Sequence, residues 1–323
     1  MGPLDCTMTR LQIVGLGQAT LDVLLRLRDL PTWETHTRLQ GFGLEGGGPV
    51  ATALVAAARL GARVGFVGTA GNDAAAEIKL RSLRECGVDL SRLVIRPTPE
   101  GQVTGVFVHS ETGERVFALM TDPEEHQLHA SELDRDYITS ADYLHLDGYH
   151  ARAAIQAAQW MRAAGKQVVL DGHRTTGPIK PHMAALVELT DVLISGAGFV
   201  QALTGISDTL AAGAAALRFG PRLVVQTEGA GGSYTVTAHD RFHTPAFAAP
   251  VVDTTGAGDV FHGAYIVGLL HGWDLRGIAQ FATAVAAIKC AKLGGRAGIP
   301  SLAETQAFLK TRGVALGSFD ATA

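Results

Sequence analysis

The sequence predicts an α/β fold of three layers, in which a mostly parallel central sheet is covered by helices on both faces and a small β-sheet forms a lid. Two observations support this prediction. From residue 142 onward, short apolar strands alternate with longer helical segments, which is typical of a parallel sheet buried on both faces. Before that point, the stretches at about 24–45 and 102–120 contain alternating polar and apolar residues, which favours strands with one face away from the main core.

Length and composition indicate a globular protein. The chain has 323 residues, of which 47% are hydrophobic, enough to fill a substantial core in one large domain or two smaller ones. Its formal net charge of −4 argues against a nonspecific nucleic-acid binder, because neutralising phosphates requires a basic surface. No apolar run suggests a signal peptide or a membrane span, so we expect neither nucleic acid nor a membrane as a partner.

Several other site classes lack their sequence signatures. Cys6, Cys86 and Cys290 are too widely spaced for a CxxC motif or a zinc pair, and we expect reduced thiols in a cytoplasmic protein. The 12 histidines show no spacing typical of zinc ligands. The absence of a G-x-x-x-x-G-K-[ST] loop and of a G-x-S-x-G elbow disfavours a P-loop enzyme and a serine hydrolase.

The first strand is predicted at residues 11–15, before the sequence Gly15-Leu16-Gly17. This sequence is half of a dinucleotide-binding fingerprint. The third glycine position holds Thr20, however, and no helical run follows before Pro31, so a nicotinamide site is disfavoured.

Glycines and caps divide the next part of the chain. Gly46-Gly47-Gly48-Pro49 leads into a helix, with Pro49 at its first position and Gly61 at its end. A short strand at 64–68 precedes a helix at 74–86, which Asn72 and Asp73 can cap. The segments 103–109 and 115–120 flank a polar turn and predict a hairpin, which would complete the small sheet.

The second half of the chain supplies the alternating pattern. We expect strands at 143–147, 167–171, 192–194 and 223–227, and helices at 151–164, 208–219 and 275–293. Ligands of such sheets bind at the carboxyl ends of the strands. Asp147, Asp171 and Arg174 lie at these ends, although capping of a loop explains each of them equally well.

The most specific stretch is Asp253-Thr254-Thr255-Gly256-Ala257-Gly258-Asp259, which runs into a long apolar helix. The start of a helix binds anions through unpaired N–H groups and the positive end of its dipole. Small residues let the backbone approach such an anion closely, and Asp259 in the first turn can receive a proton. The simpler interpretation is a glycine-rich cap that only starts the helix.

With Gly263-Ala264 behind it, this stretch resembles the second signature of the ribokinase-like, or PfkB, carbohydrate kinases. The resemblance spans about residues 11–310 and implies a single ribokinase-like domain, with 1–10 and 311–323 as loose termini. In that family the glycine turn holds the transferring phosphoryl group, and the aspartate accepts the proton of the substrate hydroxyl. By resemblance these roles fall to Gly256, Ala257, Gly258 and Asp259.

The resemblance also implies binding residues for the sugar and for ATP. Asp22, Gly46, Gly47, Gly48 and Asp253 would contact the substrate; Thr227, Gly229 and Gly232 would lie beside the nucleotide phosphates and ribose; Ala286 and Cys290 would wall the adenine pocket; and Asp147, Asp171 and Arg174 would lie in the active site.

Two departures from the family pattern concern the sugar and the metal. Ala51 stands where the first signature carries a sugar-binding asparagine, and Gly196 and Phe199 stand where the family carries Asn-x-x-Glu. Neither of the latter can offer a side-chain ligand to a hard cation. Magnesium would then be held mainly by nucleotide phosphates, water and other carboxylates, or the activity would be weak. Its protein ligands are unknown.

The sequence therefore indicates an ATP- and Mg²⁺-dependent kinase that phosphorylates a hydroxyl of a small sugar or sugar derivative. The glycines at 46–48 and the tail at 294–300 are most similar to kinases of ketose derivatives, including sulfofructose kinase. A nucleoside kinase of the same fold and a non-catalytic sugar- or nucleotide-binding relative are the alternatives. An apolar lid face left uncovered without sugar suggests a homodimer joined through the lid.

Overall fold

The computed structural model describes residues 10–120 and 126–314. Most of the two expected loose termini, including Cys6, lies outside the described residues. Cys86 and Cys290 are free thiols. No helix within the described ranges is long and apolar enough to cross a membrane.

The strands in chain order are β1 (Ile13–Leu16), β2 (Thr20–Leu27), β3 (Gly41–Gly47), β4 (Val64–Val67), β5 (Thr69–Ala70), β6 (Val94–Ile95), β7 (Val103–His109), β8 (Arg115–Leu119), β9 (Tyr143–Leu146), β10 (Gln167–Asp171), β11 (Val192–Gly196), β12 (Leu223–Thr227), β13 (Ser233–Thr237) and β14 (Arg241–Thr244).

The α-helices are α1 (Pro49–Arg59), α2 (Ala74–Glu85), α3 (Arg135–Ser140), α4 (Ala151–Ala163), α5 (Pro181–Glu188), α6 (Phe199–Thr204), α7 (Thr209–Ala216), α8 (Ala257–Leu270), α9 (Leu275–Lys289) and α10 (Leu302–Lys310); short 3₁₀ turns are η2 (Ala130–Glu132), η3 (Leu217–Phe219) and η4 (Gly229–Gly231).

The central sheet has the strand order β14-β13-β12-β11-β10-β9-β1-β4. Strands β4, β1, β9, β10, β11 and β12 are parallel, and β13 and β14 continue the sheet in antiparallel pairing. The predicted fold class is confirmed. The carboxyl ends of the parallel strands therefore meet at one edge of the sheet, where ligands of such folds bind.

Alternating side chains along the strands fill two separate cores. Ile13 and Val169 pack in a cluster with α1, α8 and α9, whereas their neighbours Val14 and Val168 pack in a second cluster with α4, α5 and α7. Because successive side chains of a strand point to opposite faces, the two clusters lie on opposite sides of the sheet. The structure thus has the three layers that the sequence predicts.

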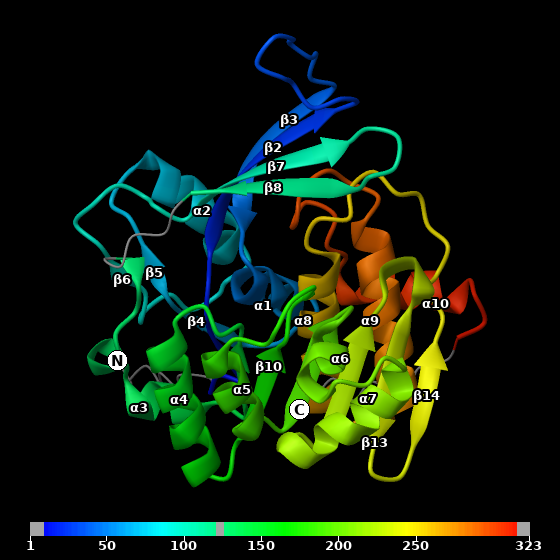
Figure 1. Cartoon of the computed structure of the whole chain (residues 1–323). Coiled ribbons are helices and arrows are strands. Elements are labelled where there is room, and N and C mark those ends of the chain that lie inside the picture. Colours follow the sequence, from blue (N-terminus) through cyan, green and yellow to red (C-terminus); the bar gives the residue numbers. More distant parts are fainter. Residues whose placement is uncertain (1–9, 121–125, 315–323) are drawn as a thin grey trace, which may run out of the picture.

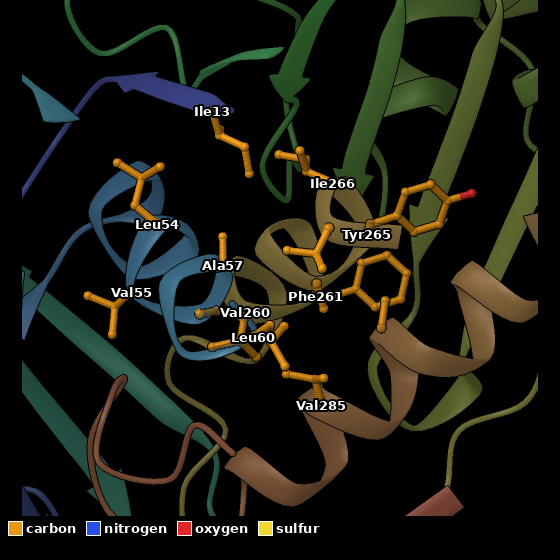
Figure 2. Close-up of a cluster of buried hydrophobic side chains, with 14 of the residues drawn as sticks. Ile13, Leu54, Val55, Ala57, Leu60, Val260, Phe261, Tyr265, Ile266 and Val285 are labelled. Atoms are coloured by element: carbon orange, nitrogen blue, oxygen red, sulfur yellow. The ribbon is translucent and has the colours of Figure 1, made fainter. Parts of the chain in front are cut away.

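The first core joins the helix after the glycine-rich turn to the rest of the domain. Figure 2 shows Leu60, which directly follows α1, beside Val260 of α8 and Val285 of α9; Leu54 of α1 and Phe261 of α8 belong to the same cluster. This packing fixes the direction of α8, and hence the place where its first turn lies.

The small sheet has the strand order β3-β2-β7-β8 and lies over one end of the central sheet (Figure 1). Its inner face packs Leu24, Val106 and Val108 against Leu293. The base of this sheet is tied to α2 by a fully buried ion pair, in which Lys79 Nζ lies 2.6 Å from Glu100 Oε2. The small sheet is thus anchored at one end.

Several boundaries differ from those the sequence predicts. Strand β2 begins at Thr20, and only three residues separate it from the end of β1 at Leu16, so a strand follows where a dinucleotide site needs a helix. The helix expected at 275–293 ends at Lys289, because the Cys290 carbonyl accepts the N–H groups of Val252 and Asp253, at 2.8 and 3.2 Å. The antiparallel strands β13 and β14 and the helices α3, α5, α6 and α10 were not predicted.

Candidate active site

The glycine turn forms the start of α8. Gly256 is the N-cap residue and has the left-handed φ of 73°, which a side chain would strain; a Cβ there would also lie 2.9 Å from Gly295. A Cβ on Gly258 would meet nothing within 4 Å. Asp259 follows in the first turn. The helix start is therefore open on the side of Gly258, next to a carboxyl group.

The loop before α8 is held by buried polar contacts. The two carboxylate oxygens of Asp253 accept the N–H groups of Thr255 and Gly294, each at 2.7 Å. Buried Lys289 donates from Nζ to the carbonyls of Asp253, at 3.0 Å, and Thr255. Burial lowers the pKa of Lys289. These contacts hold the glycine turn in place. They also engage both side-chain oxygens of Asp253, a residue that the sequence predicts to bind the substrate.

Asp259 has surroundings that suit a base working near neutral pH. Burial of its carboxyl group and the nearby negative charge of Asp171 raise its pKa to about 7, while His173 and Arg115 act in the opposite direction. A general base is most effective when its pKa lies near the working pH. The geometry thus places a titrating carboxyl group beside the helix start.

The small sheet β3-β2-β7-β8, called the lid from here on, contacts the loop before α8 through Arg115, at the start of β8. Its Nη1 donates to Thr254 Oγ1 at 2.7 Å, and that hydroxyl donates to the carbonyl of Gly113 at 3.0 Å. The guanidinium is close enough to lower the pKa of Asp259. The sequence analysis missed Arg115, because its partner lies 139 residues away in the chain.

Most of the residues that the sequence predicts to contact the sugar lie on β2, on β3 and at the start of α1. Asp22 is buried, accepts from Thr20 Oγ1 at 2.6 Å, and has a pKa raised chiefly by burial. Any side chain at Gly47 would collide with the Asp22 carboxylate, whereas one at Gly46 would collide with the Lys79 carbonyl. Gly48 is the N-cap residue of α1. Gly47 therefore makes room for the Asp22 carboxylate itself, while Gly46 lets β3 pack against α2.

Arg296 is a buried cation in this region that the sequence analysis did not list. Its Nε donates to Thr52 Oγ1 at 3.1 Å, one terminal nitrogen donates to Ser82 Oγ at 2.8 Å, and the other donates to the Gly47 carbonyl. Burial lowers the pKa of Arg296 to about 10, although the negative charges of Asp22 and Glu45 act to raise it. Arg296 thus fastens the chain after α9 to α1, α2 and β3.

The expected nucleotide residues lie at the end of β12 and near the end of α9. Thr227 donates from Oγ1 to the Ser195 carbonyl at 3.3 Å. A Cβ on Gly229 would meet nothing within 4 Å, whereas one on Gly232 would collide with the Thr244 carbonyl. Ala286 is half-buried, and Cys290, one helical turn later, is buried. The turn at 228–232 also joins the antiparallel strands β12 and β13.

The three residues at the carboxyl ends of β9 and β10 have different surroundings. Asp147 accepts from the backbone N–H groups of Gln18, at 2.8 Å, and Tyr149, at 2.9 Å. Asp171 accepts from the N–H of His173 at 2.6 Å. Arg174 is exposed. Loop capping therefore accounts for Asp147. Asp171 has a further effect, because its negative charge raises the pKa of Asp259.

The protein side chains do not form a cage for magnesium. No group of three or more His, Cys, Asp and Glu side chains in the described part of the chain could hold a metal ion. The N–H of Gly196 donates to the His173 carbonyl at 2.9 Å, and Phe199 is buried in the second core. These positions therefore do not fit a magnesium site built from protein ligands.

Comparison with known families decides what class of protein this is. The family model of the pfkB family carbohydrate kinases matches residues 10–302. The chain belongs to the pfkB family of carbohydrate kinases. The ribokinase-like fold predicted from the sequence and the prediction of a carbohydrate kinase are therefore confirmed.

Individual pfkB relatives match along nearly their whole length. The 5-dehydro-2-deoxygluconokinase of Shouchella clausii is 29% identical, over 94% of this chain and 96% of its own. The ATP-dependent ribose-1-phosphate kinase of Halopiger xanaduensis is 27% identical, over 93% and 99%. An Escherichia coli structure solved with ATP and Mg²⁺ has a TM-score of 0.81 and 24% identity, covering 93% of this chain and 99% of that one.

Proposed function

We propose that this kinase transfers the γ-phosphoryl group of ATP to a hydroxyl of a small sugar or sugar derivative, with Asp259 as the base. The observation that most directly supports this role is the carboxyl group of Asp259 beside an open helix start, with its pKa raised to about 7 by burial and by Asp171. Ionised, it accepts the proton of the attacking hydroxyl and makes the oxygen a better nucleophile.

The residues around Asp259 would stabilise the transferring group. Phosphoryl transfer depends mainly on positioning and on stabilising charge spread over the phosphoryl oxygens. The first N–H groups of α8 and the positive end of its dipole favour such an anion, and Gly258 leaves it room to approach. Arg115, bonded to the same loop through Thr254, adds a positive charge from the lid. Magnesium would arrive with the nucleotide phosphates.

The acceptor would lie beneath the lid, between Asp22 and Asp259. The Asp22 carboxylate, which occupies the space that the missing side chain of Gly47 leaves, would accept hydrogen bonds from sugar hydroxyls. The nucleotide would lie beyond α8. Its phosphates and ribose would lie along Thr227 and Gly229, and its adenine ring would lie near Ala286 and Cys290. In this arrangement residues 11–310 act as one catalytic domain, with lid segments inserted at about 24–45 and 102–120.

The substrate would be a ketose derivative rather than a nucleoside. The sequence pattern at 294–300 supports this, and the 5-dehydro-2-deoxygluconokinase relative takes its name from a keto sugar acid. A screen should therefore include fructose, sulfofructose, 5-dehydro-2-deoxygluconate, ribose, ribose 1-phosphate and adenosine, with ATP consumption as the readout. Turnover of adenosine alone would favour the nucleoside-kinase alternative.

Replacing the base tests the mechanism once an acceptor is found. Asp259→Asn keeps the size of the side chain but cannot take a proton, so we expect kcat to fall by about 10²- to 10⁴-fold, with nucleotide binding retained. Asp240→Asn, in an exposed pair with Arg276, is the matched control and should keep the wild-type rate. Wild-type turnover by Asp259→Asn would remove Asp259 from the mechanism.

A further inference from the structure

A cluster of imidazoles and carboxylates lies next to Asp259. Asp171, at the end of β10, has Oδ1 3.6 Å from His173 Nδ1 and Oδ2 3.6 Å from His262 Nδ1. His262 belongs to α8, one turn after Asp259, and its ring packs edge-on against that of His145, with centroids 5.6 Å apart. The proposed reaction uses none of these histidines directly.

The contacts of His173 favour its charged form. Its Nε2 lies 2.7 Å from the Asp147 carbonyl oxygen, and a carbonyl can only accept, so Nε2 must carry a hydrogen. Its Nδ1 faces the carboxylate of Asp171. A ring held between a carbonyl and a carboxylate is stabilised with both nitrogens protonated. The geometry therefore favours the imidazolium form of His173.

The other two histidines of the cluster are neutral. Burial lowers the pKa of His145 to about 3 and also lowers the pKa of His262. His173 differs because 42% of its side chain is exposed. Partial burial acts to lower its pKa, but Asp171 and Asp147 outweigh it and the pKa is raised. The positive charge of the cluster thus resides on His173.

The backbone of His173 is held in an uncommon conformation. With φ at 53°, it is the one non-glycine residue in 10–120 and 126–314 with a left-handed φ. Its N–H donates to Asp171 Oδ1 at 2.6 Å, and its carbonyl accepts from Gly196 at 2.9 Å. Such strain is concentrated at functional sites. The two backbone hydrogen bonds hold His173 beside Asp171.

We propose that His173 is a positioning residue for Asp259: its imidazolium balances the charge of Asp171 and thereby sets the pH at which the base becomes ionised. This inference rests on the proposed role of Asp259. The charged groups that act on Asp259 are Asp171 and Asp22, which oppose its ionisation, and His173 and Arg115, which favour it; Arg296 also lies within electrostatic range.

The direction of the effect follows from these charges. His173→Asn removes the imidazolium but leaves Asp171 negative, so the pKa of Asp259 rises. Asparagine also adopts a left-handed φ more readily than most residues, so the loop should keep its shape. In the double variant Asp171→Asn/His173→Asn both charges are gone, and the pKa of Asp259 should return toward the wild-type value.

The pH dependence of kcat/KM for the acceptor tests the proposal. We expect the acidic limb of His173→Asn to move to higher pH by at least about half a unit, and that of the double variant to move back. His239→Asn, a change at an exposed histidine in the turn between β13 and β14, should leave the limb in place. If His173→Asn retains the wild-type thermal midpoint and the wild-type acidic limb, the proposal is wrong.

A second measurement separates this inference from the proposed function. A ¹⁵N NMR titration of the histidine rings in the apo protein needs no substrate. His173 should titrate above its ordinary value of about 6.5, and its midpoint should fall in Asp171→Asn. Titration of His173 below that value in the wild type would overturn the inference, even in an active kinase. A raised midpoint in a protein that phosphorylates no acceptor would instead count against the proposed function alone.

Discussion

The aspartates around the site have the same side chain but different surroundings. Asp147 and Asp253 each offer both oxygens to backbone N–H groups, so their carboxylates hold loops in place. Asp259 instead lies in the first turn of α8, and burial and Asp171 raise its pKa to about 7. Residue type alone therefore does not distinguish a loop-holding aspartate from a base.

The raised pKa of Asp259 predicts the pH dependence of the reaction. The carboxyl group accepts a proton only when ionised, which is above its pKa of about 7. As the pH falls through that value the base is lost, and kcat/KM should drop by about tenfold per pH unit. Measuring kcat/KM between about pH 5 and pH 9 checks this expectation. A profile that stays flat down to the ordinary pKa of aspartate would contradict it.

Gly196 and Phe199 lead to a prediction about the metal. Since the described side chains form no cluster able to hold a cation, magnesium should bind weakly to the protein without nucleotide. Calorimetry with Mg²⁺ alone should show no tight binding, whereas Mg²⁺ added with a non-hydrolysable ATP analogue should bind. Tight binding without the analogue would point to carboxylates on the protein.

At the scale of elements, the contact between α1 and α8 determines where the glycine turn lies. Gly263 is buried in α8, and any Cβ there would collide with the backbone carbonyl of Ala53 in α1. Backbone atoms cannot turn aside as a side chain can, so the two helices would have to separate. Gly263, which belongs to the signature, thus has a packing role distinct from the chemistry.

Gly263→Ala should therefore destabilise the protein. We expect a loss of about 1–3 kcal/mol, the usual cost of overpacking a core, measured by denaturant unfolding. The matched control is Gly277→Ala in α9, where a Cβ would come no closer than 3.1 Å to a side-chain oxygen of Asp274; its effect should stay within about 0.5 kcal/mol. Equal stability of the two variants would show that α1 and α8 separate at no cost.

At the scale of the whole molecule, the outer face of the lid is an exposed apolar surface. Strand register places Phe42, Leu25, Phe107 and Val116 side by side across the four strands, on the face opposite Asp22. Phe42 is 61% exposed and Val116 is 48% exposed. A contiguous exposed apolar face is typical of interaction surfaces. The homodimer stays a prediction, and we propose this face as its contact.

A charge on this face should prevent dimerisation. We expect the wild type to be a dimer by light scattering at micromolar concentration and Phe42→Glu to be a monomer, because an unpaired charge is costly in an apolar interface. Leu119→Glu, on the inner face of the same sheet, is the control for a charge elsewhere on the lid and should remain dimeric. A monomeric wild type would contradict the predicted dimer.

The sequence by itself determined the fold class and the position of the helix start. Alternation of strands and helices after residue 142 indicated the parallel sheet, and both strand periodicity and helix spacing are local properties that short segments carry. The glycine stretch before α8 was equally local. Strands β13 and β14 were missed because both contain many polar residues. They are defined by the antiparallel pairing of β13 with β12 and of β14 with β13.

Only the tertiary structure decided which groups surround Asp259. Arg115 comes from the lid, His173 follows β10, and Arg296 lies beyond α9; each reaches the site across a large separation in the chain. Burial and the distances between charged groups determine their pKa values. Neither burial nor these distances can be deduced from the residues adjacent in the sequence. The sequence determined where Asp259 lies in the chain, at the start of α8, while packing of the lid and the sheet edge around it decided how strongly its carboxyl group holds a proton.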